Sequence, residues 1–252
     1  MELQGATIAS GAKQTTNLSK QFIADGVGFV ELMECFGSDL TVVNAARVSF
    51  YKESSFEEAL IDGVPSQRLA DRDAKLIHFL AAHNHNTPFF HPQLRFRIKM
   101  PIFVAREWWR STIGFARNEV SRRYVDDMPD FFTPDGLRQR DKNLKQGSKL
   151  EFIVNNEKMM AGMQDYIRQT QAYYQELLDQ GVAPEQARMI LPQSMYTEFI
   201  ETASIAGYAR LVGLRTDPTA QKEIRDYAHL VSRLVEPRFP VSWKALMVTK
   251  GV

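Results

Sequence analysis

The 252-residue sequence predicts an α+β fold that is rich in helices. Two segments are predicted as strands: 26–37, which is bounded by glycines, and 94–100, in which apolar and basic residues alternate. Several longer segments instead repeat apolar residues at helical spacing. Strands and helices do not alternate regularly along the chain, which argues against a doubly wound parallel sheet. With 44% hydrophobic and 24% charged residues, the composition is that of a globular protein with a sizeable core.

The first quarter of the chain is expected to contain a flexible arm, a strand, a helix and a loop. Residues 1–25 are polar and aperiodic, which predicts a flexible N-terminal arm, and residues 26–252 are expected to form a single domain. Glycines bound the strand over 26–37. Asp39 is a favourable N-cap for a helix that follows up to Phe50. The polar residues after it, up to Arg68, predict a loop.

A second helix is expected from Asp71 to about His83, where apolar residues recur on one face. In the strand 94–100, Leu, Phe and Ile alternate with Arg and Lys, which predicts one buried face and one wet face. Pro101 suits the first turn of the next helix, over 102–111, because proline lacks the N–H that would be unpaired there. An irregular polar stretch follows.

The second half of the chain is expected to be mainly helical, apart from an exposed insertion at 130–149. The basic residues in the insertion are expected on a solvated face: Arg138, Arg140, Lys142 and Lys145. An amphipathic helix is predicted over 150–180, because Gly181 is typical of the residue just after a helix end. Further helices are expected over 183–192, 194–215 and 218–235, the last of them opened by Asp217 and Pro218.

The overall charge and the single cysteine limit the partners of the chain. The 31 basic and 30 acidic side chains leave a formal charge of +1, so no global basic surface indicates a nucleic acid or an anionic membrane. No apolar run approaches the roughly 18 residues that span a bilayer, and no secretory signal is recognisable, so the expected location is the cytoplasm. Cys35 cannot form an internal disulfide and is expected to be a small buried side chain.

The segment 105–124 carries the densest group of candidate functional residues. Forked guanidinium groups bind phosphate and aromatic faces cover a flat ring, so this mixture is a candidate site for a ring that carries an anion. An amphipathic helix followed by a surface loop explains the composition about equally well. The density of arginines favours a site, because Glu107 and Glu119 are the only local counter-charges. The arginines are Arg106, Arg110, Arg117, Arg122 and Arg123.

Four of the five histidines fall within fourteen residues: His78, His83, His85 and His91. No cysteine and no helix-spaced His-Glu pair accompanies them, so no metal is expected. Hydrogen bonds within a loop, or contacts to a polar cofactor, are the preferred interpretations. The sequence also contains neither a glycine-rich phosphate loop nor the nucleophile elbow of a serine hydrolase.

Arg215 is a separate candidate, at the end of a predicted helix and just before the next helix start. A helix N-terminus favours anions, but here Asp217 is expected to occupy it. Arg215 could therefore contact a ligand, or it could pair with Asp217 or Glu223. The residues alone leave this choice open.

Several segments, taken together and in order, resemble the flavin-dependent thymidylate synthases, from about Gly28 to Val248. These segments are GFVELMECFGSDLTVVNAARVSF, HNTPFFH, MPIFVAREWWRSTIGFARNEVSRRY, ARMILPQSMYTEF and LRTDPTAQKEIRDYA. The resemblance implies that residues 26–252 are a mixed α/β catalytic domain that assembles as a homotetramer, with FAD and dUMP in sites shared between subunits. It implies an enzyme that transfers a methylene from methylenetetrahydrofolate to C5 of dUMP, with hydride relayed by FAD from NADPH.

The resemblance also implies roles for individual residues. Arg215 is implied as the catalytic cation that stabilises negative charge on the pyrimidine. Substrate contacts are implied for Glu107, Arg110, Glu119, Val120, Ser121, Arg122, Arg123 and Arg215. Cofactor contacts are implied for Ser49, Thr87, Arg110, Ser111, Thr112, Glu119, Ser204 and Arg210. This route needs no protein nucleophile, which agrees with the distance in sequence between Cys35 and every candidate site.

The signature of the family is altered here in four respects. Ser111 and Thr112 stand where the family has His and Arg, and eight residues instead of seven precede Ser121. Glu107 stands where a glutamine is common, and Glu198 where some members have a phosphate-binding arginine. Because a carboxylate repels a phosphate, these two glutamates are expected either to pair with arginines or to indicate another substrate. The alternatives are a related pyrimidine nucleotide methylase or hydroxymethylase, and a non-catalytic nucleotide-binding relative.

Overall fold

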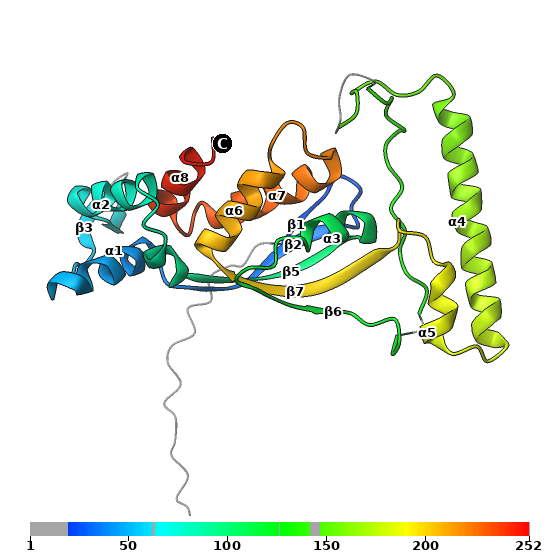
Figure 1. Ribbon diagram of the computed structural model, residues 1–252, viewed down its shortest axis with the longest axis horizontal. Coiled ribbons are helices and arrows are strands. Elements are labelled where there is room, and N and C mark those ends of the chain that lie inside the picture. Colours follow the sequence, from blue (N-terminus) through cyan, green and yellow to red (C-terminus); the bar gives the residue numbers. More distant parts are fainter. Residues whose placement is uncertain (1–19, 62–63, 126, 142–146, 252) are drawn as a thin grey trace, which may run out of the picture.

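The computed structural model describes residues 20–61, 64–125, 127–141 and 147–251. Its centre is a five-stranded antiparallel sheet with helices along one face, and a separate two-stranded hairpin completes the strands (Figure 1). This arrangement confirms the predicted α+β class, rich in helices. No helix in these ranges is long and apolar enough to cross a membrane.

The sheet has the strand order β1, β2, β5, β7, β6, and every neighbouring pair is antiparallel. Its strands are β1 (Lys20–Phe22), β2 (Phe29–Phe36), β5 (Gln93–Pro101), β7 (Tyr196–Ser204) and β6 (Phe115–Glu119). β5 and β7 form the centre, and β6 is an edge strand that pairs with β7. The expected N-terminal arm lies mostly outside the described residues, but its residues 20–22 form β1 and so belong to the sheet.

The alternation of β5 decides which face of the sheet is covered. Leu94, Phe96 and Ile98 are buried beneath the helices, whereas Arg95 and Arg97 lie on the opposite, open face. The apolar residues at every second position therefore give the strand one buried side, as the sequence predicts. The open face consequently carries charged side chains along its centre.

Two groups of helices pack on the sheet and at its end (Figure 1). The helices over the covered face are α3 (Ile102–Trp108), α6 (Ile205–Arg215) and α7 (Lys222–Val235). The helices grouped at one end are α1 (Asp39–Arg47), α2 (Asp71–Ala82) and α8 (Pro240–Val248). Trp108, Tyr208 and Trp243 are among the largest fully buried side chains of the core between these layers.

Asp39, at the start of α1, forms hydrogen bonds with α8 near the other end of the chain. It was expected to cap its own helix, but α1 begins after Ser38, whose N–H donates to Thr41 Oγ1 (3.0 Å). The buried Asp39 carboxylate instead accepts from the N–H groups of Val241 (2.9 Å) and Ser242 (2.8 Å) in the first turn of α8. Asp39 therefore caps a helix about 200 residues later in the chain.

The described residues also contain three short 3₁₀ helices and a hairpin. The 3₁₀ helices are η1 (Val48–Phe50), η2 (Thr87–Phe90) and η3 (Arg188–Ile190). The hairpin consists of β3 (Glu57–Ile61) and β4 (Val64–Arg68). The sequence predicts a loop over 51–68, so the hairpin corrects that prediction. The strands of the hairpin were not predicted because they contain many polar residues. Glu57 and Glu58 lie opposite Arg68 and Gln67 across the two strands.

A long helix, α4 (Asn156–Asp179), stands at the edge of the molecule and leads into α5 (Pro184–Ala187) (Figure 1). Only Thr170 and Tyr174 of α4 are buried among the described residues. The helix ends as expected before Gly181, which adopts a positive φ of 81°. The predicted helix at 150–180 is thus confirmed, with a later start.

The strand β7 is the largest departure from the prediction, because the sequence predicts a helix over 194–215. Residues 196–204 are a strand, and α6 accounts for the rest of that range. Thr197 and Glu201 face the covered side together with Phe199, so polar and apolar residues do not alternate along β7. A second correction concerns α7, which begins at Lys222 and not at Pro218.

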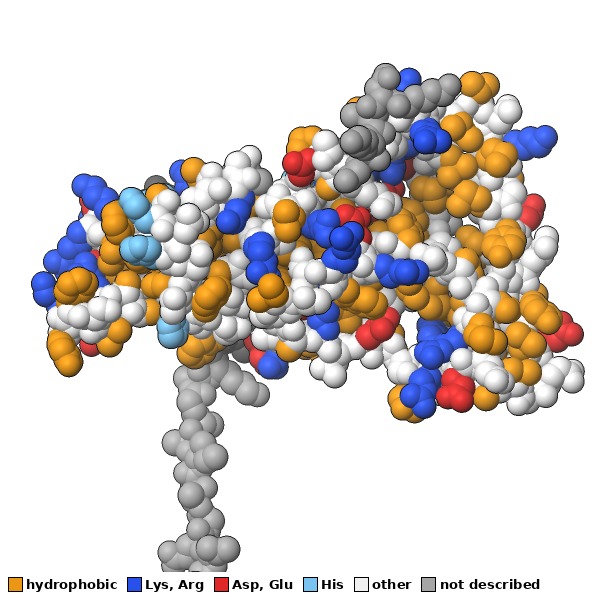
Figure 2. Space-filling model, viewed as in Figure 1, with side chains coloured by type: hydrophobic (Ala, Val, Ile, Leu, Met, Phe, Trp, Pro, Cys, Tyr) orange, Lys and Arg blue, Asp and Glu red, His pale blue; other side chains and the backbone are white. Residues whose placement is uncertain are grey.

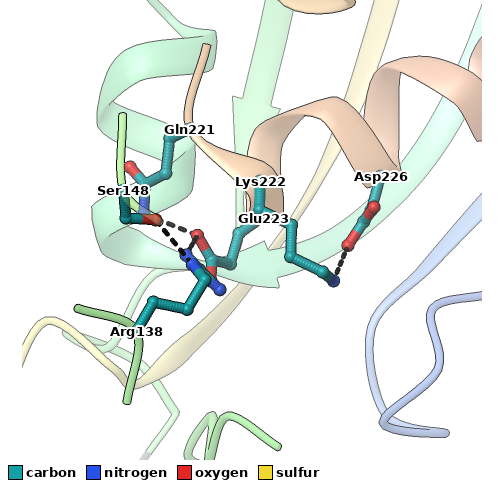
Figure 3. A network of polar contacts seen from close by, with 6 residues as sticks. All are labelled: Arg138, Ser148, Gln221, Lys222, Glu223 and Asp226. Carbon is teal, nitrogen blue, oxygen red and sulfur yellow. Dashed lines mark hydrogen bonds and ion pairs between the residues drawn. The ribbon is translucent and has the colours of Figure 1, made fainter. Parts of the chain in front are cut away.

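The described part of the segment 130–149 is fastened to α7, and Figure 3 shows the contacts. Arg138 donates to both carboxylate oxygens of Glu223 (2.7 and 3.0 Å) and to Ser148 Oγ (2.8 Å). Burial raises the pKa of Glu223, but hydrogen bonds from Arg138 and Gln221 outweigh burial and leave the pKa below its usual value. Arg138 is thus not on a solvated face. Lys142 and Lys145 lie outside the described residues.

Candidate active site

The segment after β6 lies beside a groove of about 520 Å³ on the open face of the sheet. Val120 N–H donates to the carbonyl oxygen of Glu198 (2.8 Å), and Glu119 Oε1 accepts from Thr197 Oγ1 (2.6 Å). These bonds continue the attachment of β6 to β7 to the end of the strand. The predicted residues that line the groove are Glu119, Val120 and Arg122, and Asn118 lies beside them.

Two cations of the groove were not singled out from the sequence. Arg97 and Lys99, on β5, line it together with Arg122. Arg97 forms an ion pair with Glu198, and Lys99 pairs with Asp130 (2.6 Å). Their alternation with apolar residues marked them as the wet face of a strand, and only the fold brings that face to the 119–123 segment. The cations of the groove are thus partly neutralised within the chain.

Ser121 and Arg123 lie next to α5 and η3. Ser121 Oγ accepts from the N–H of Arg123 (3.3 Å), and Arg123 Nε lies 3.4 Å from Glu185 Oε2. Arg188 Nε donates to the carbonyl oxygen of the same Glu185 (3.3 Å). Figure 2 shows basic side chains gathered between the sheet and α5. Arg188, which was not singled out from the sequence, thus contacts the main chain of the residue whose side chain pairs with Arg123.

Arg215 pairs with neither of the two carboxylates considered for it. Its Nη1 donates to Glu107 Oε1 (2.6 Å) and its Nη2 to the carbonyl oxygen of Glu107 (3.0 Å). Arg215 Nε is buried and has no hydrogen-bond partner in the described structure. Asp217 instead bonds Thr219, which lowers the pKa of the Asp217 carboxyl, and Glu223 bonds Arg138.

Both glutamates that depart from the family signature are paired with arginines. Glu107 pairs with Arg215, and Glu198 pairs with Arg97. This is the first of the two outcomes expected from the sequence, so neither carboxylate remains as an uncompensated charge next to a substrate anion. The pair Glu107–Arg215 joins α3 to the end of α6, over the covered face of the sheet.

The residues implied for the cofactor lie around the opposite end of β6. Ser204 caps α6 by accepting from the N–H of Gly207 (3.2 Å), and Arg210 Nη2 donates to the carbonyl oxygen of Ile113 (2.7 Å). This second bond attaches α6 to the loop that contains Ser111 and Thr112. Ser49 and Thr87 are exposed on η1 and η2.

The charges of this region suit an anionic cofactor. Arg110 is exposed and has no side-chain hydrogen bond or ion pair with the described residues, and Arg210 has no carboxylate partner among them. Two guanidinium groups with uncompensated charge fit the pyrophosphate of FAD. Ser111 and Thr112 offer hydroxyl groups where the family signature has cationic side chains.

Ser111 and Thr112, implied for the cofactor, precede β6, whereas Ser121 and Arg123, implied for the substrate, follow it. At about 3.3 Å per residue, the five residues of β6 that lie between them span about 15 Å. No hydrogen bond or ion pair among the described residues connects Arg215 to the 119–123 segment. The chain thus brings together Glu107 with Arg215, and Glu119 with Val120 and Arg122, but it does not gather all implied residues at one point.

Two of the histidines, His83 and His85, form an aromatic cluster with Phe79 at the end of α2. The ring of His83 stacks at 4.1 Å on that of Phe79, and His85 approaches the same phenylalanine edge-on at 5.9 Å. Within the described ranges, no group of three or more His, Cys, Asp or Glu residues is arranged to hold a metal ion. Cys35 is half-buried on β2, and burial raises the pKa of its thiol, so the thiolate is disfavoured.

Comparison with known proteins decides the family. The family model described as "Thymidylate synthase complementing protein" (Thy1) matches residues 31–241, which include every site described above. The chain belongs to this family. The matched range of this Thy1 chain runs from β2 into α8 and excludes only the ends of the described structure.

Relatives of this Thy1 chain carry related names. It is 36% identical over 218 residues to a flavin-dependent thymidylate synthase of Thermus thermophilus, covering 86% of this chain and 75% of the relative. It is 35% identical over 224 residues to that of Thermosipho africanus, covering 87% and 91%. A solved structure of the UMP/dUMP methylase PolB from Streptomyces cacaoi, bound with 5-Br dUMP, has 29% identity and a TM-score of 0.73, covering 87% of this chain and 94% of PolB.

Proposed function

We propose that the chain is a flavin-dependent thymidylate synthase, an enzyme that uses FAD to methylate dUMP to dTMP. The observation that carries the proposal is the Thy1 match over residues 31–241, together with relatives of that name over most of their length. The carbon donor is methylenetetrahydrofolate, and the hydride comes from NADPH through the flavin.

The nucleotide is proposed to bind at the 119–123 segment. Ser121 and Arg123 supply a hydroxyl and a guanidinium group for the phosphate, and Arg188 supports them because it lies beside the same Glu185. The main-chain groups next to Val120 and Arg122 add further donors. Phosphate binding here requires the anion to compete with Glu185 for Arg123, an exposed pair that is weak in water.

Arg215 is proposed to stabilise the negative charge that develops on the pyrimidine during attack on the methylene donor. Glu107 holds its guanidinium group in one orientation through two bonds. Glu107 uses two of the five guanidinium N–H groups of Arg215, and an N–H of Nη1 or Nη2 that Glu107 does not use is proposed to bind a substrate oxygen. Since no thiolate is required, the unreactive environment of Cys35 agrees with this mechanism.

FAD is proposed to be held by Arg110 and Arg210 at its pyrophosphate, and by Ser49, Thr87, Ser111, Thr112 and Ser204 at polar groups. Its isoalloxazine supplies hydride transfer when it is bound. Glu119 is proposed to lie at the junction between the flavin and the nucleotide, where its bond to Thr197 fixes the carboxylate.

We further propose a homotetramer in which a second copy completes each site. The separation of the implied cofactor and nucleotide residues along β6 supports this assembly, since one subunit does not place them together. Size-exclusion chromatography with light scattering tests it, and a monomer that retains full turnover would contradict it.

A second candidate is methylation of a related pyrimidine nucleotide. The altered signature at Ser111 and Thr112 favours it, as does the similarity to PolB, which is described as a UMP/dUMP methylase. Turnover of dUMP, UMP and dCMP, with mass measurement of each product, separates the two. A product heavier by a hydroxymethyl group instead of a methyl group would indicate a hydroxymethylase.

The direct test of the main proposal is spectroscopic and radiochemical. The purified protein is expected to be yellow, and its flavin absorbance is expected to change when dUMP is added. With methylenetetrahydrofolate and NADPH it should release tritium from dUMP labelled at C5. A colourless protein that binds no FAD would refute the proposal.

A further inference from the structure

A carboxylate with no role in the proposed mechanism is buried at the centre of the molecule. Glu201, on β7, has a side chain that is 0% exposed. Its Oε1 accepts from Trp108 Nε1 (3.2 Å), and its Oε2 accepts from Arg117 Nε. Burial raises the pKa of Glu201, and the bonds from Arg117, Trp108 and Tyr208 oppose that rise. A carboxylate at such a position needs all of its partners.

Arg117, on β6, depends on Glu201 in turn. Its side chain is 15% exposed, and its guanidinium group lies 4.7 Å from the centre of the Phe115 ring. Its Nη2 is buried and has no hydrogen-bond partner in the described structure. Glu201 is the one carboxylate that pairs with Arg117 among the described residues. Removal of the negative charge would leave a nearly buried cation unpaired.

The bonds of Glu201 reach three elements that carry proposed site residues. Trp108 ends α3 and follows Glu107, the partner of Arg215. Arg117 lies in β6, four residues before Ser121. In addition, Tyr208 Oη in α6 donates to the main-chain oxygen of Glu201 (3.3 Å). One buried residue therefore fastens both halves of the proposed nucleotide machinery to the central strand.

The position of β6 depends strongly on the bond between Arg117 and Glu201. β6 is an edge strand of five residues, so its ladder with β7 is the main other restraint on its position. Arg117 pairs directly opposite Glu201 in the register, and Glu119 lies on the same face. The Arg117–Glu201 pair and the Glu119–Thr197 bond thus fix both the middle and the end of the strand.

We propose that Glu201 and Arg117 are a positioning pair, which holds β6 and the 119–123 segment that follows it in place on β7 for binding of the pyrimidine nucleotide. Neither residue touches the substrate. The inference rests on the proposed function, because it concerns the same nucleotide site. It assigns a role in substrate affinity to two residues that the family resemblance does not implicate.

The first experiment uses Glu201→Gln in the full-length protein with FAD. Glutamine keeps the size and an acceptor oxygen but removes the charge. The KM for dUMP is expected to rise about tenfold, with kcat reduced less than threefold and the FAD content unchanged, because a small displacement of a binding segment is costly. Glu34→Gln is the matched control, since Glu34 pairs with Arg95 (2.8 Å) across strands on the open face, away from this pair. It is expected to leave both constants unchanged.

Rescue distinguishes positioning from general stability. The double variant Arg117→Gln/Glu201→Gln replaces the ion pair by two amides that bond each other without charge, and its KM for dUMP is expected to return to within about threefold of the wild type. A KM that does not recover would overturn the proposal. The proposal would also be overturned if Glu201→Gln lowered kcat and left the KM for dUMP unchanged. It would be overturned as well if Glu34→Gln raised the KM for dUMP as much as Glu201→Gln.

A readout without turnover separates this proposal from the proposed function. Hydrogen exchange of residues 115–123 is expected to accelerate in Glu201→Gln and to slow again in the double variant. Unchanged exchange there would overturn the positioning role, whereas a wild-type protein inactive on dUMP would refute the proposed function alone. If Glu201→Gln does not fold, Arg117→Lys serves instead. It keeps the charge and loses the forked geometry, and an unchanged KM for dUMP in that variant would count against the pair.

Discussion

Replacement of Glu107 by glutamine is expected to raise kcat/KM for dUMP. Glutamine still offers an amide oxygen to Arg215 Nη1, which lies 2.6 Å from the Glu107 carboxylate, so the orientation of the guanidinium group is kept. The negative charge is lost, however. In the proposed mechanism Arg215 stabilises developing negative charge on the pyrimidine, and the neighbouring carboxylate opposes that charge. Its removal should therefore lower the activation barrier.

The size of the effect follows from the separation of the charges. A pyrimidine oxygen on the far side of the guanidinium group lies about 7 Å from the Glu107 carboxylate, and two unit charges at that distance repel by about 2.4 kcal/mol at an effective dielectric constant of about 20. The side chains of Arg215 and Glu107 are 16% and 29% exposed, and the charge on the pyrimidine is partial. We therefore halve this to about 1.2 kcal/mol, a rate factor of about eight.

The assay is the initial rate of dTMP formation against dUMP concentration, at saturating FAD, folate donor and NADPH. It is repeated at two salt concentrations, because an electrostatic effect shrinks at high salt. Asp165→Asn is the control, since Asp165 pairs with Arg168 on the exposed surface of α4. A kcat/KM that is unchanged or lower in Glu107→Gln, with intact FAD content, would refute the reasoning.

Three further predictions concern other residues. Arg215→Ala is expected to lower kcat by about 10²–10³-fold with FAD still bound, and loss of flavin absorbance would instead assign Arg215 to the cofactor. Ser121→Ala is expected to raise the KM for dUMP about fivefold, the value of one hydrogen bond, and an inactive variant with normal dUMP affinity would contradict this role. Because the pKa of Glu223 is lowered in the folded state, its contribution to stability is present above about pH 4.5 and is lost as the pH falls through the lowered pKa. Glu223→Gln should therefore cost about 2 kcal/mol in urea unfolding at pH 7, the value of hydrogen bonds to a charged group, and the cost should shrink as the pH is lowered below 4.5. A cost that does not change with pH would speak against the Arg138 pair.

The strand β5 follows from the sequence because one of its sides is apolar at every second residue, and β2 follows from its strand-like composition between glycines. The same reasoning fails for β7, whose covered face includes Thr197 and Glu201. Such polar residues are satisfied by partners that lie far away in the chain, as Glu201 is by Trp108, which is 93 residues distant. Local periodicity does not contain that information.

The candidate site is predictable only in part for the same reason. The density of arginines in 105–124 predicts a functional segment, and Glu119, Val120 and Arg122 of that segment line a groove. The partner of Arg215 was not predictable, since Glu107 lies 108 residues earlier. Arg97 and Lys99 look like the solvent side of an ordinary strand until the sheet order places them opposite β7.

The bond between Asp39 and the first turn of α8 affects how the chain matures during translation. About 200 residues separate the carboxylate from its two donors, and at 5–20 residues per second the ribosome needs roughly 10–40 s to make them. Until then α1 and α2 lack the helix that covers them. A truncated product that lacks α8 would expose the apolar surface of α1 and α2, and the Asp39 carboxylate would lack its two N–H donors. Such a product is expected to be degraded by proteases that act on unfolded chains.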